Sequence, residues 1–115
     1  MNEFQMTEFE QEVYRVTKAI PFGRVATYLD IAKAIGKPGA SRAVGNALHK
    51  NPLMIIIPCH RVVNRQGGLA VNFGYHGYQG HQELLESEGV KVVNHQVDLS
   101  IYRADLSKCS IKSIS

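Results

Sequence analysis

Cysteine is scarce in this sequence, with only Cys59 and Cys109 among 115 residues. Their separation does not match a Cys-x-x-Cys zinc or redox pair, and two cysteines are too few for a disulfide-rich domain. The five histidines likewise contain no His-x-x-x-His pair. The sequence therefore predicts no metal site, and we expect no cofactor.

Long apolar runs are also missing. None approaches the ~20 residues that a membrane-spanning helix needs, so we expect no membrane association. The segment Met1–Glu12 is acidic, whereas a secretory signal peptide is basic and then apolar. We therefore expect a cytoplasmic location, or a nuclear one in a eukaryote.

The composition is that of a folded domain. An apolar share of 44% and a charged share of 20% argue against disorder. The length predicts one domain over residues 1–106 with a polar tail over 107–115, and we expect a monomer. The formal charge of +3 is compatible with a polyanionic partner but does not identify one.

Capping signals and apolar periodicity predict three helices in the first half of the chain. Thr7 and Glu10 have the spacing of a capping box at the start of the first helix. Thr27 and Asp30 repeat that spacing for the second helix, and the third is expected over 41–50. A short Gly/Pro linker joins the last two, which is the outline of a helix-turn-helix, although many helical hairpins share it.

The second half of the chain mixes strand and helix signals. The apolar run 53–57, closed by Pro58, predicts a buried strand or extended segment. Five glycines predict a loop over 64–80, followed by a helix over about 79–88 and a short strand over 91–93. We therefore expect a small α/β, winged-helix-like domain that is mostly helical with short strands.

Cys59 is the candidate nucleophile. It is flanked by His60 and Arg61, and a nearby imidazole or cation favours the thiolate form of cysteine. The alternative is a buried structural cysteine, since free cysteine is among the most buried residue types. Neighbouring side chains of an extended chain face opposite ways, so His60 requires a turn or a bridging water to reach Cys59. Glu88 is a candidate carboxylate for orienting His60.

Four side chains are candidates for contacting nucleic acid. Arg42 opens the third helix, where a helix-turn-helix presents its first residues to the bases. The Tyr28 hydroxyl is placed to meet a phosphate, and Tyr75 and Tyr78 could stack on an extruded base. Each has a structural alternative: a solvated arginine, a half-buried core tyrosine, or packing within the loop.

The string Ile57-Pro58-Cys59-His60-Arg61-Val62-Val63 resembles the active-site motif of the alkylguanine-DNA alkyltransferases, also called methylated-DNA–protein-cysteine methyltransferases. Other segments resemble this family in the same order and at near-family spacing, so that the resemblance covers residues 9–93. These segments are Gly23–Tyr28, Ser41–Leu48, Asn51-Pro52 and Leu84–Gly89.

The resemblance implies an activity and a catalytic set. The protein would flip alkylated guanine out of double-stranded DNA and transfer the alkyl group irreversibly to Cys59. His60 would act on the thiol through a water, with Glu88 holding the histidine. Asn51 would support the turn around the site. A thioether has no leaving group that water easily displaces, so each molecule would react once.

The resemblance also implies a DNA-binding set. Arg42 would fill the gap left by the flipped guanine, because a wedge that replaces lost stacking offsets part of the cost of extrusion. Tyr28 would press on the neighbouring phosphate, and Ser41 and Arg61 are counted with the DNA-binding residues. The base pocket is expected at Tyr75 and Gly77, in a stretch that resembles the family's Gly-Tyr core.

Two other hypotheses stay open beside the enzyme. The length and the ending Asp98–Arg103 are similar to the alkyltransferase-like proteins, which bind alkylated guanine without repairing it and recruit excision-repair proteins. Those proteins typically carry tryptophan where this chain has Cys59. Classical members of the family carry an N-terminal domain before this region, and some of them bind zinc there. We expect neither that domain nor its zinc in this chain, which favours such a lesion sensor. The third hypothesis is a helix-turn-helix regulator with a structural cysteine.

Overall fold

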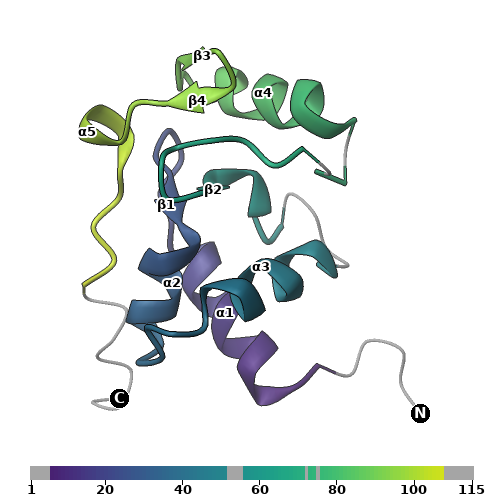
Figure 1. The fold of residues 1–115 in the computed structure, drawn as a ribbon, viewed down its shortest axis with the longest axis vertical. Helices are drawn as coiled ribbons and strands as arrows, with labels where there is room; N and C mark the ends of the chain where they lie inside the picture. Colours follow the sequence, from purple (N-terminus) through teal and green to yellow (C-terminus); the bar gives the residue numbers. More distant parts are fainter. Residues whose placement is uncertain (1–5, 52–55, 72, 75, 108–115) are drawn as a thin grey trace.

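The computed structural model describes residues 6–51, 56–71, 73–74 and 76–107 (Figure 1). Part of the expected strand over 53–57, Tyr75, Cys109 and nearly all of the expected tail lie outside these residues. In chain order the elements of the described part are α1 (Glu8–Lys18), β1 (Ala26–Thr27), α2 (Tyr28–Ala34), α3 (Ser41–His49), the 3-10 helix η1 (Cys59–Arg61), β2 (Val62–Val63), α4 (Gly77–Ser87), β3 (Val92–Val93), β4 (Gln96–Val97) and α5 (Leu99–Tyr102).

The two expected capping boxes are confirmed. At α1 the Thr7 hydroxyl accepts the Glu10 N–H and the Glu10 carboxylate accepts the Thr7 N–H, both at 3.0 Å. Thr27 and Asp30 make the same pair of bonds at α2, again at 3.0 Å. A cap of this kind stabilises a helix by about 1 kcal/mol, which explains why both helices begin where the sequence places them.

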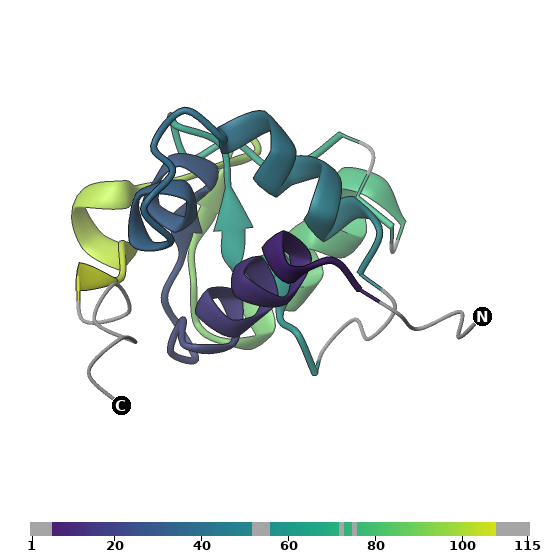
Figure 2. The same ribbon diagram turned by 90° about the horizontal axis from the view of Figure 1, so that it is seen from below.

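Helices α1, α2 and α3 pack against one another and enclose the larger core (Figures 1 and 2). Val16, Ile31 and Val44, one from each helix, are fully buried there. The Tyr14 hydroxyl, on α1, donates a 2.7 Å hydrogen bond to the Ala47 carbonyl near the end of α3. This packing fixes the direction of α3, whose outer face lines the site described below.

Strands β1 and β2 join this helical layer to the upper part of the molecule in Figure 1. They pair in parallel, with Ala26 opposite Val62 and Thr27 opposite Val63. α2 follows β1 directly and η1 precedes β2 directly, so this two-residue pairing links the segments that carry Tyr28 and Cys59. Two segments more than thirty residues apart in the sequence thus come together.

A smaller core lies between α4 and the β3–β4 hairpin, where Val25, Val63, Leu85 and Val90 are buried. Val92 pairs with Val97 in antiparallel register. The sequence predicted β3 but missed its partner β4, which is only two residues long. Within the described residues, every helix is too short or too polar to cross a membrane.

Two expectations require correction. The loop expected to run through Gly80 ends earlier, because α4 begins at Gly77, which has φ +60°. The run before Pro58 was expected to be buried, but Ile56 is 66% exposed, whereas Ile57 is 4% exposed. Of the two described residues of this run, Ile57 packs into the helical core and Ile56 does not.

Candidate active site

A turn after Pro58, one of the two alternatives that the sequence left open, is present. Residues Cys59–Arg61 form η1, in which the Arg61 N–H bonds to the Pro58 carbonyl at 2.9 Å. The Cys59 N–H bonds to the Ile57 carbonyl at 2.7 Å. This tight turn carries the Cys59 side chain to the wall of a cavity and sends the His60 ring toward α4.

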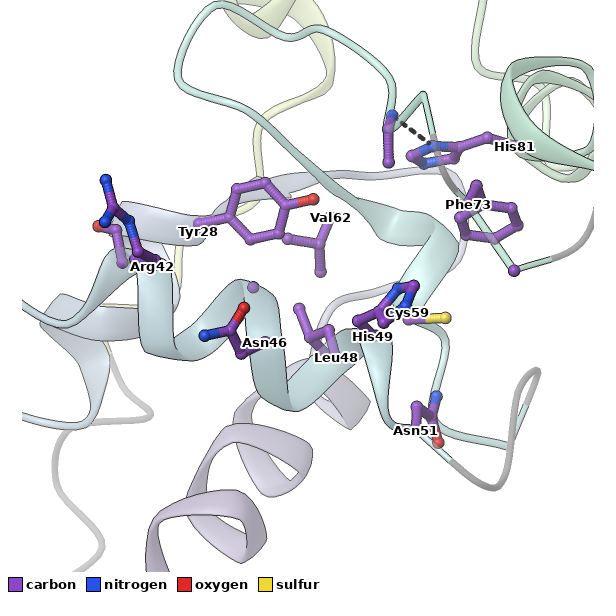
Figure 3. Close-up of a pocket in the computed structure, with 14 residues that line it drawn as sticks. Tyr28, Arg42, Asn46, Leu48, His49, Asn51, Cys59, Val62, Phe73 and His81 are labelled. Carbon is purple, nitrogen blue, oxygen red and sulfur yellow. Dashed lines mark hydrogen bonds between the residues drawn. The ribbon is translucent and has the colours of Figure 1, made fainter.

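A cavity of about 400 Å³ lies between α3, η1 and α4 (Figure 3). Arg42 and Tyr28 lie toward one end, and Cys59, Phe73 and His81 toward the other. None of the lining residues that the structure describes is a carboxylate. They are Tyr28, Ser41, Arg42, Gly45, Asn46, Leu48, His49, Asn51, Cys59, Val62, Ala70, Phe73, Gly74 and His81.

Five of the side chains expected to form the site line this one cavity: Tyr28, Ser41, Arg42, Asn51 and Cys59. Arg42 is exposed at the first turn of α3. Tyr28 is half-buried at the start of α2, and burial raises the pKa of its hydroxyl. Tyr28 therefore remains protonated and can donate a hydrogen bond.

Asn51 holds the cysteine turn. Its Nδ2–H donates to the Ile57 carbonyl at 2.8 Å, and its side chain also makes a hydrogen bond with Cys59. Burial raises the pKa of the Cys59 thiol, while the Asn51 bond opposes that shift. At neutral pH the resting side chain is therefore a thiol, and nucleophilic attack requires a base that removes its proton.

A buried carboxylate holds His60. His60 Nε2 lies 2.7 Å from Glu88 Oε2, and the two side chains are 4% and 7% exposed. Burial raises the pKa of the Glu88 carboxyl, but hydrogen bonds from Arg61, from the Gly23 N–H and from His60 outweigh it and hold that pKa below its usual value. Glu88 is therefore ionised and accepts the Nε2–H of His60.

The other nitrogen of His60 is free to act as a base. Among the described residues, none bonds to His60 Nδ1, although this atom is buried. Burial lowers the pKa of His60, and Glu88 only partly compensates. At neutral pH the ring is thus uncharged, with its proton on Nε2 and a bare, basic Nδ1.

Arg61, which is counted with the expected DNA-binding residues, binds the Glu88 carboxylate. Its guanidinium forms hydrogen bonds of 2.9–3.1 Å with both oxygens of Glu88, and it also donates to the Ile20 carbonyl at 2.8 Å. The ring of Phe22 covers it at 5.7 Å. Arg61 is absent from the cavity wall, so its geometry is that of an internal partner for Glu88.

Of the two expected base-pocket residues, only Gly77 lies in the part of the chain that the structure describes. Gly77 is the first residue of α4 and is not among the lining residues, and Tyr75 lies outside the described residues. Tyr78 stacks on His95 of the hairpin, with ring centroids 4.3 Å apart. Among the described residues, the wall opposite α3 is made by Phe73, Gly74 and His81.

His81 is the residue that sequence reasoning missed. It is 1% exposed on α4, and Phe73 stacks on it with ring centroids 4.4 Å apart. A histidine between polar neighbours on a predicted helix carries no signal of burial, so only the fold identifies it. Across the described residues, no cluster of three or more His, Cys, Asp or Glu side chains could hold a metal ion.

The fold and the cavity together define a small helix-turn-helix protein. Its buried cysteine lies beside α3, the second helix of the helix-turn-helix. Residues 8–90 match the family described as 6-O-methylguanine DNA methyltransferase, DNA binding domain. The chain belongs to this family.

Relatives of known name agree with this assignment. Methylated-DNA–protein-cysteine methyltransferase of Methanosarcina acetivorans is 49% identical over 84 residues, which are 72% of this chain and 52% of that protein. The protein of the same name from Salmonella typhimurium is 46% identical over 83 residues, which are 72% of this chain and 47% of that protein. The chain thus spans about half the length of these relatives.

Solved structures confirm the predicted fold class. S. pombe Atl1, crystallised with damaged DNA containing O6-carboxymethylguanine, superimposes with a TM-score of 0.78 at 33% identity. The match covers 89% of this chain and 99% of that one. Mycobacterium tuberculosis OGT in complex with DNA gives a TM-score of 0.67 at 42% identity, covering 74% of this chain and 51% of that one.

Proposed function

We propose that this protein repairs DNA by flipping an alkylated guanine out of the duplex and taking the alkyl group on Cys59 in a single turnover. The observation that carries the proposal is the placement of the Cys59 side chain. It lies on the wall of a cavity beside α3, bonded to Asn51, and the next residue, His60, forms a buried pair with Glu88.

The proposed reaction needs no co-reactant. The thiol proton leaves through a bridging water to His60 Nδ1, and the sulfur attacks the alkyl carbon. A sulfur–carbon bond forms as the bond between that carbon and the guanine O6 breaks. The electron pair of the broken bond goes to the guanine, which takes up a proton, so the thiol hydrogen is exchanged for the alkyl group. The thioether product is stable, and the protein is consumed.

The DNA side of the proposal rests on the opposite end of the cavity. Arg42 and Ser41 begin α3 and Tyr28 begins α2, and all three line the cavity that would receive the base. In this proposal Arg42 replaces the stacking of the extruded guanine and Tyr28 contacts a nearby phosphate. The names of the relatives and the DNA bound in the structures of Atl1 and OGT support the same partner.

A lesion sensor is the second candidate. Its support is the match to Atl1, which extends over 99% of that chain, whereas the match to OGT extends over 51%. In a sensor Cys59 stays unmodified, the alkylated guanine remains in the DNA, and excision-repair proteins complete the repair. The buried His60–Glu88 pair has no catalytic task in that case.

The mass of the intact protein separates the two candidates. Wild-type protein is mixed with an equimolar duplex that contains one O6-methylguanine, and Cys59→Ala serves as the control. Transfer predicts a gain of one methyl group by the wild type and none by the variant, while both bind the lesion. Tight binding by the wild type without any gain in mass would identify a sensor.

A further inference from the structure

His81 connects α4 to the turn that carries Cys59. Its Nε2 lies 2.8 Å from the backbone carbonyl of His60, and its Nδ1 accepts the Ala70 N–H at 3.1 Å. A carbonyl oxygen can only accept and an amide N–H can only donate. One neutral tautomer, with the proton on Nε2, therefore satisfies both bonds.

The same ring supports the cavity wall. Phe73 stacks on His81 with an angle of 15° between the ring planes, and both residues line the cavity opposite α3 (Figure 3). His81 thus ties together three parts of the chain that are separate in sequence: the cysteine turn, the segment that contains Ala70 and Phe73, and α4.

We propose that His81 is a positioning residue for alkyl transfer, which fixes the Cys59 turn and the Phe73 wall at the spacing that an extruded base requires. This inference rests on the proposed function. His81 acts through the His60 carbonyl and the Phe73 ring, and it exchanges no proton with the reacting atoms. Such a role matters because a misplacement of about 1 Å can slow a reaction by about 100-fold.

The test uses three variants in a Cys109→Ser background, so that Cys59 is the only thiol. His81→Leu removes both hydrogen bonds. His81→Gln keeps one donor and one acceptor on a flexible side chain. Val90→Ala is the control for general destabilisation, because Val90 is 1% exposed in the smaller core and does not line the cavity.

Two rates are measured for each variant. The first is the single-turnover rate of methyl transfer at saturating lesion DNA, together with the affinity for undamaged duplex. The second is the rate at which Cys59 reacts with dithiodipyridine, which forms a mixed disulfide and releases thiopyridone. This small reagent reacts with the thiolate, so its rate reports the ionisation and the accessibility of the sulfur without requiring a bound base.

His81→Leu is expected to slow transfer by about 100-fold, to leave duplex affinity unchanged and to speed the reaction with dithiodipyridine relative to Val90→Ala. The rate of methyl transfer by His81→Gln is expected to stay within about tenfold of the wild-type rate, which is the effect of losing about one neutral hydrogen bond. Transfer by His81→Leu at the rate of Val90→Ala, or a Gln variant as slow as the Leu variant, would overturn the proposal.

The experiment also separates the two proposals. If the wild type transfers no methyl group, the proposed function fails, and the reaction with dithiodipyridine then decides the role of His81. Equal reactivity of Cys59 in His81→Leu and Val90→Ala would show that His81 does not hold the cysteine turn. Faster reaction in His81→Leu would support the positioning role within a sensor.

Discussion

Acidification is expected to destabilise this protein through His81 before its carboxylates become protonated. Burial lowers the pKa of His81 to about 4. In the unfolded chain a histidine titrates near 6.5. The stability that His81 contributes is therefore complete above pH 6.5 and is lost as the pH falls from 6.5 toward 4, because only the unfolded chain takes up the proton in that range.

The magnitude follows from these two pKa values. Each pH unit between them reduces the free energy of unfolding by about 1.4 kcal/mol, which amounts to about 3 kcal/mol in all. Between pH 7.5 and pH 5.5 the loss due to His81 is about 1 kcal/mol. His60, whose pKa burial also lowers, adds a loss of the same sign. The fold lowers the pKa values of the Asp30 and Glu88 carboxyls below their usual values for carboxyls. Protonation of these two groups therefore reduces the free energy of unfolding only in more acidic solution.

Urea denaturation followed by far-ultraviolet circular dichroism measures this loss, because the sequence has no tryptophan for fluorescence. The decrease in the free energy of unfolding between pH 7.5 and pH 5.5 is compared for wild type, His81→Gln and His49→Gln. His49→Gln is the matched control, because it removes an exposed histidine. His81→Gln should lose about 1 kcal/mol less than the wild type. An identical loss in His81→Gln and wild type would refute the neutral, buried state assigned to His81.

Three other perturbations test the remaining parts of the site. Arg42→Ala should reduce methyl transfer more than it reduces affinity for undamaged duplex, measured by single-turnover kinetics and fluorescence anisotropy; equal losses would argue against a wedge that acts on the flipped state. Binding should weaken steeply with salt, with a log–log slope of about −0.9 for each phosphate contact, and a flat response would place the basic residues away from DNA. Glu88→Ala should lower the free energy of unfolding by about 3–5 kcal/mol, because it leaves the Arg61 guanidinium without its carboxylate. The double variant Arg61→Met/Glu88→Ala should regain part of that loss in urea denaturation, and additive losses would contradict the pairing.

Local sequence signals predicted the helices well. The capping boxes at Thr7 and Thr27 specify where α1 and α2 begin, because the bonds join residues only three apart. The family resemblance anticipated the His60–Glu88 pair, which the structure places at 2.7 Å. A local rule alone could not show that these two side chains meet, since 28 residues separate them.

Contacts between distant segments account for what was missed. His81 bonds to the carbonyl of a residue 21 positions away, and its burial follows from the docking of α4 against η1. Arg61 is counted with the expected DNA-binding residues, and no local signal in the sequence points to an internal partner for it. Its partner Glu88 lies 27 positions away, so the internal ion pair became visible only in the fold.

Peptide mapping by mass spectrometry decides whether Cys59 accepts the alkyl group. The protein is incubated with an excess of duplex containing O6-methylguanine, digested, and both cysteine peptides are quantified. Alkyl transfer to Cys59 predicts one methyl group per molecule, on the Cys59 peptide, and an unmodified Cys109 peptide. Loss of this signal in Cys59→Ser is expected, because a hydroxyl is a much weaker nucleophile than a thiolate. A Cys59 peptide that stays unmodified while the lesion is bound would show that Cys59 is not the alkyl acceptor.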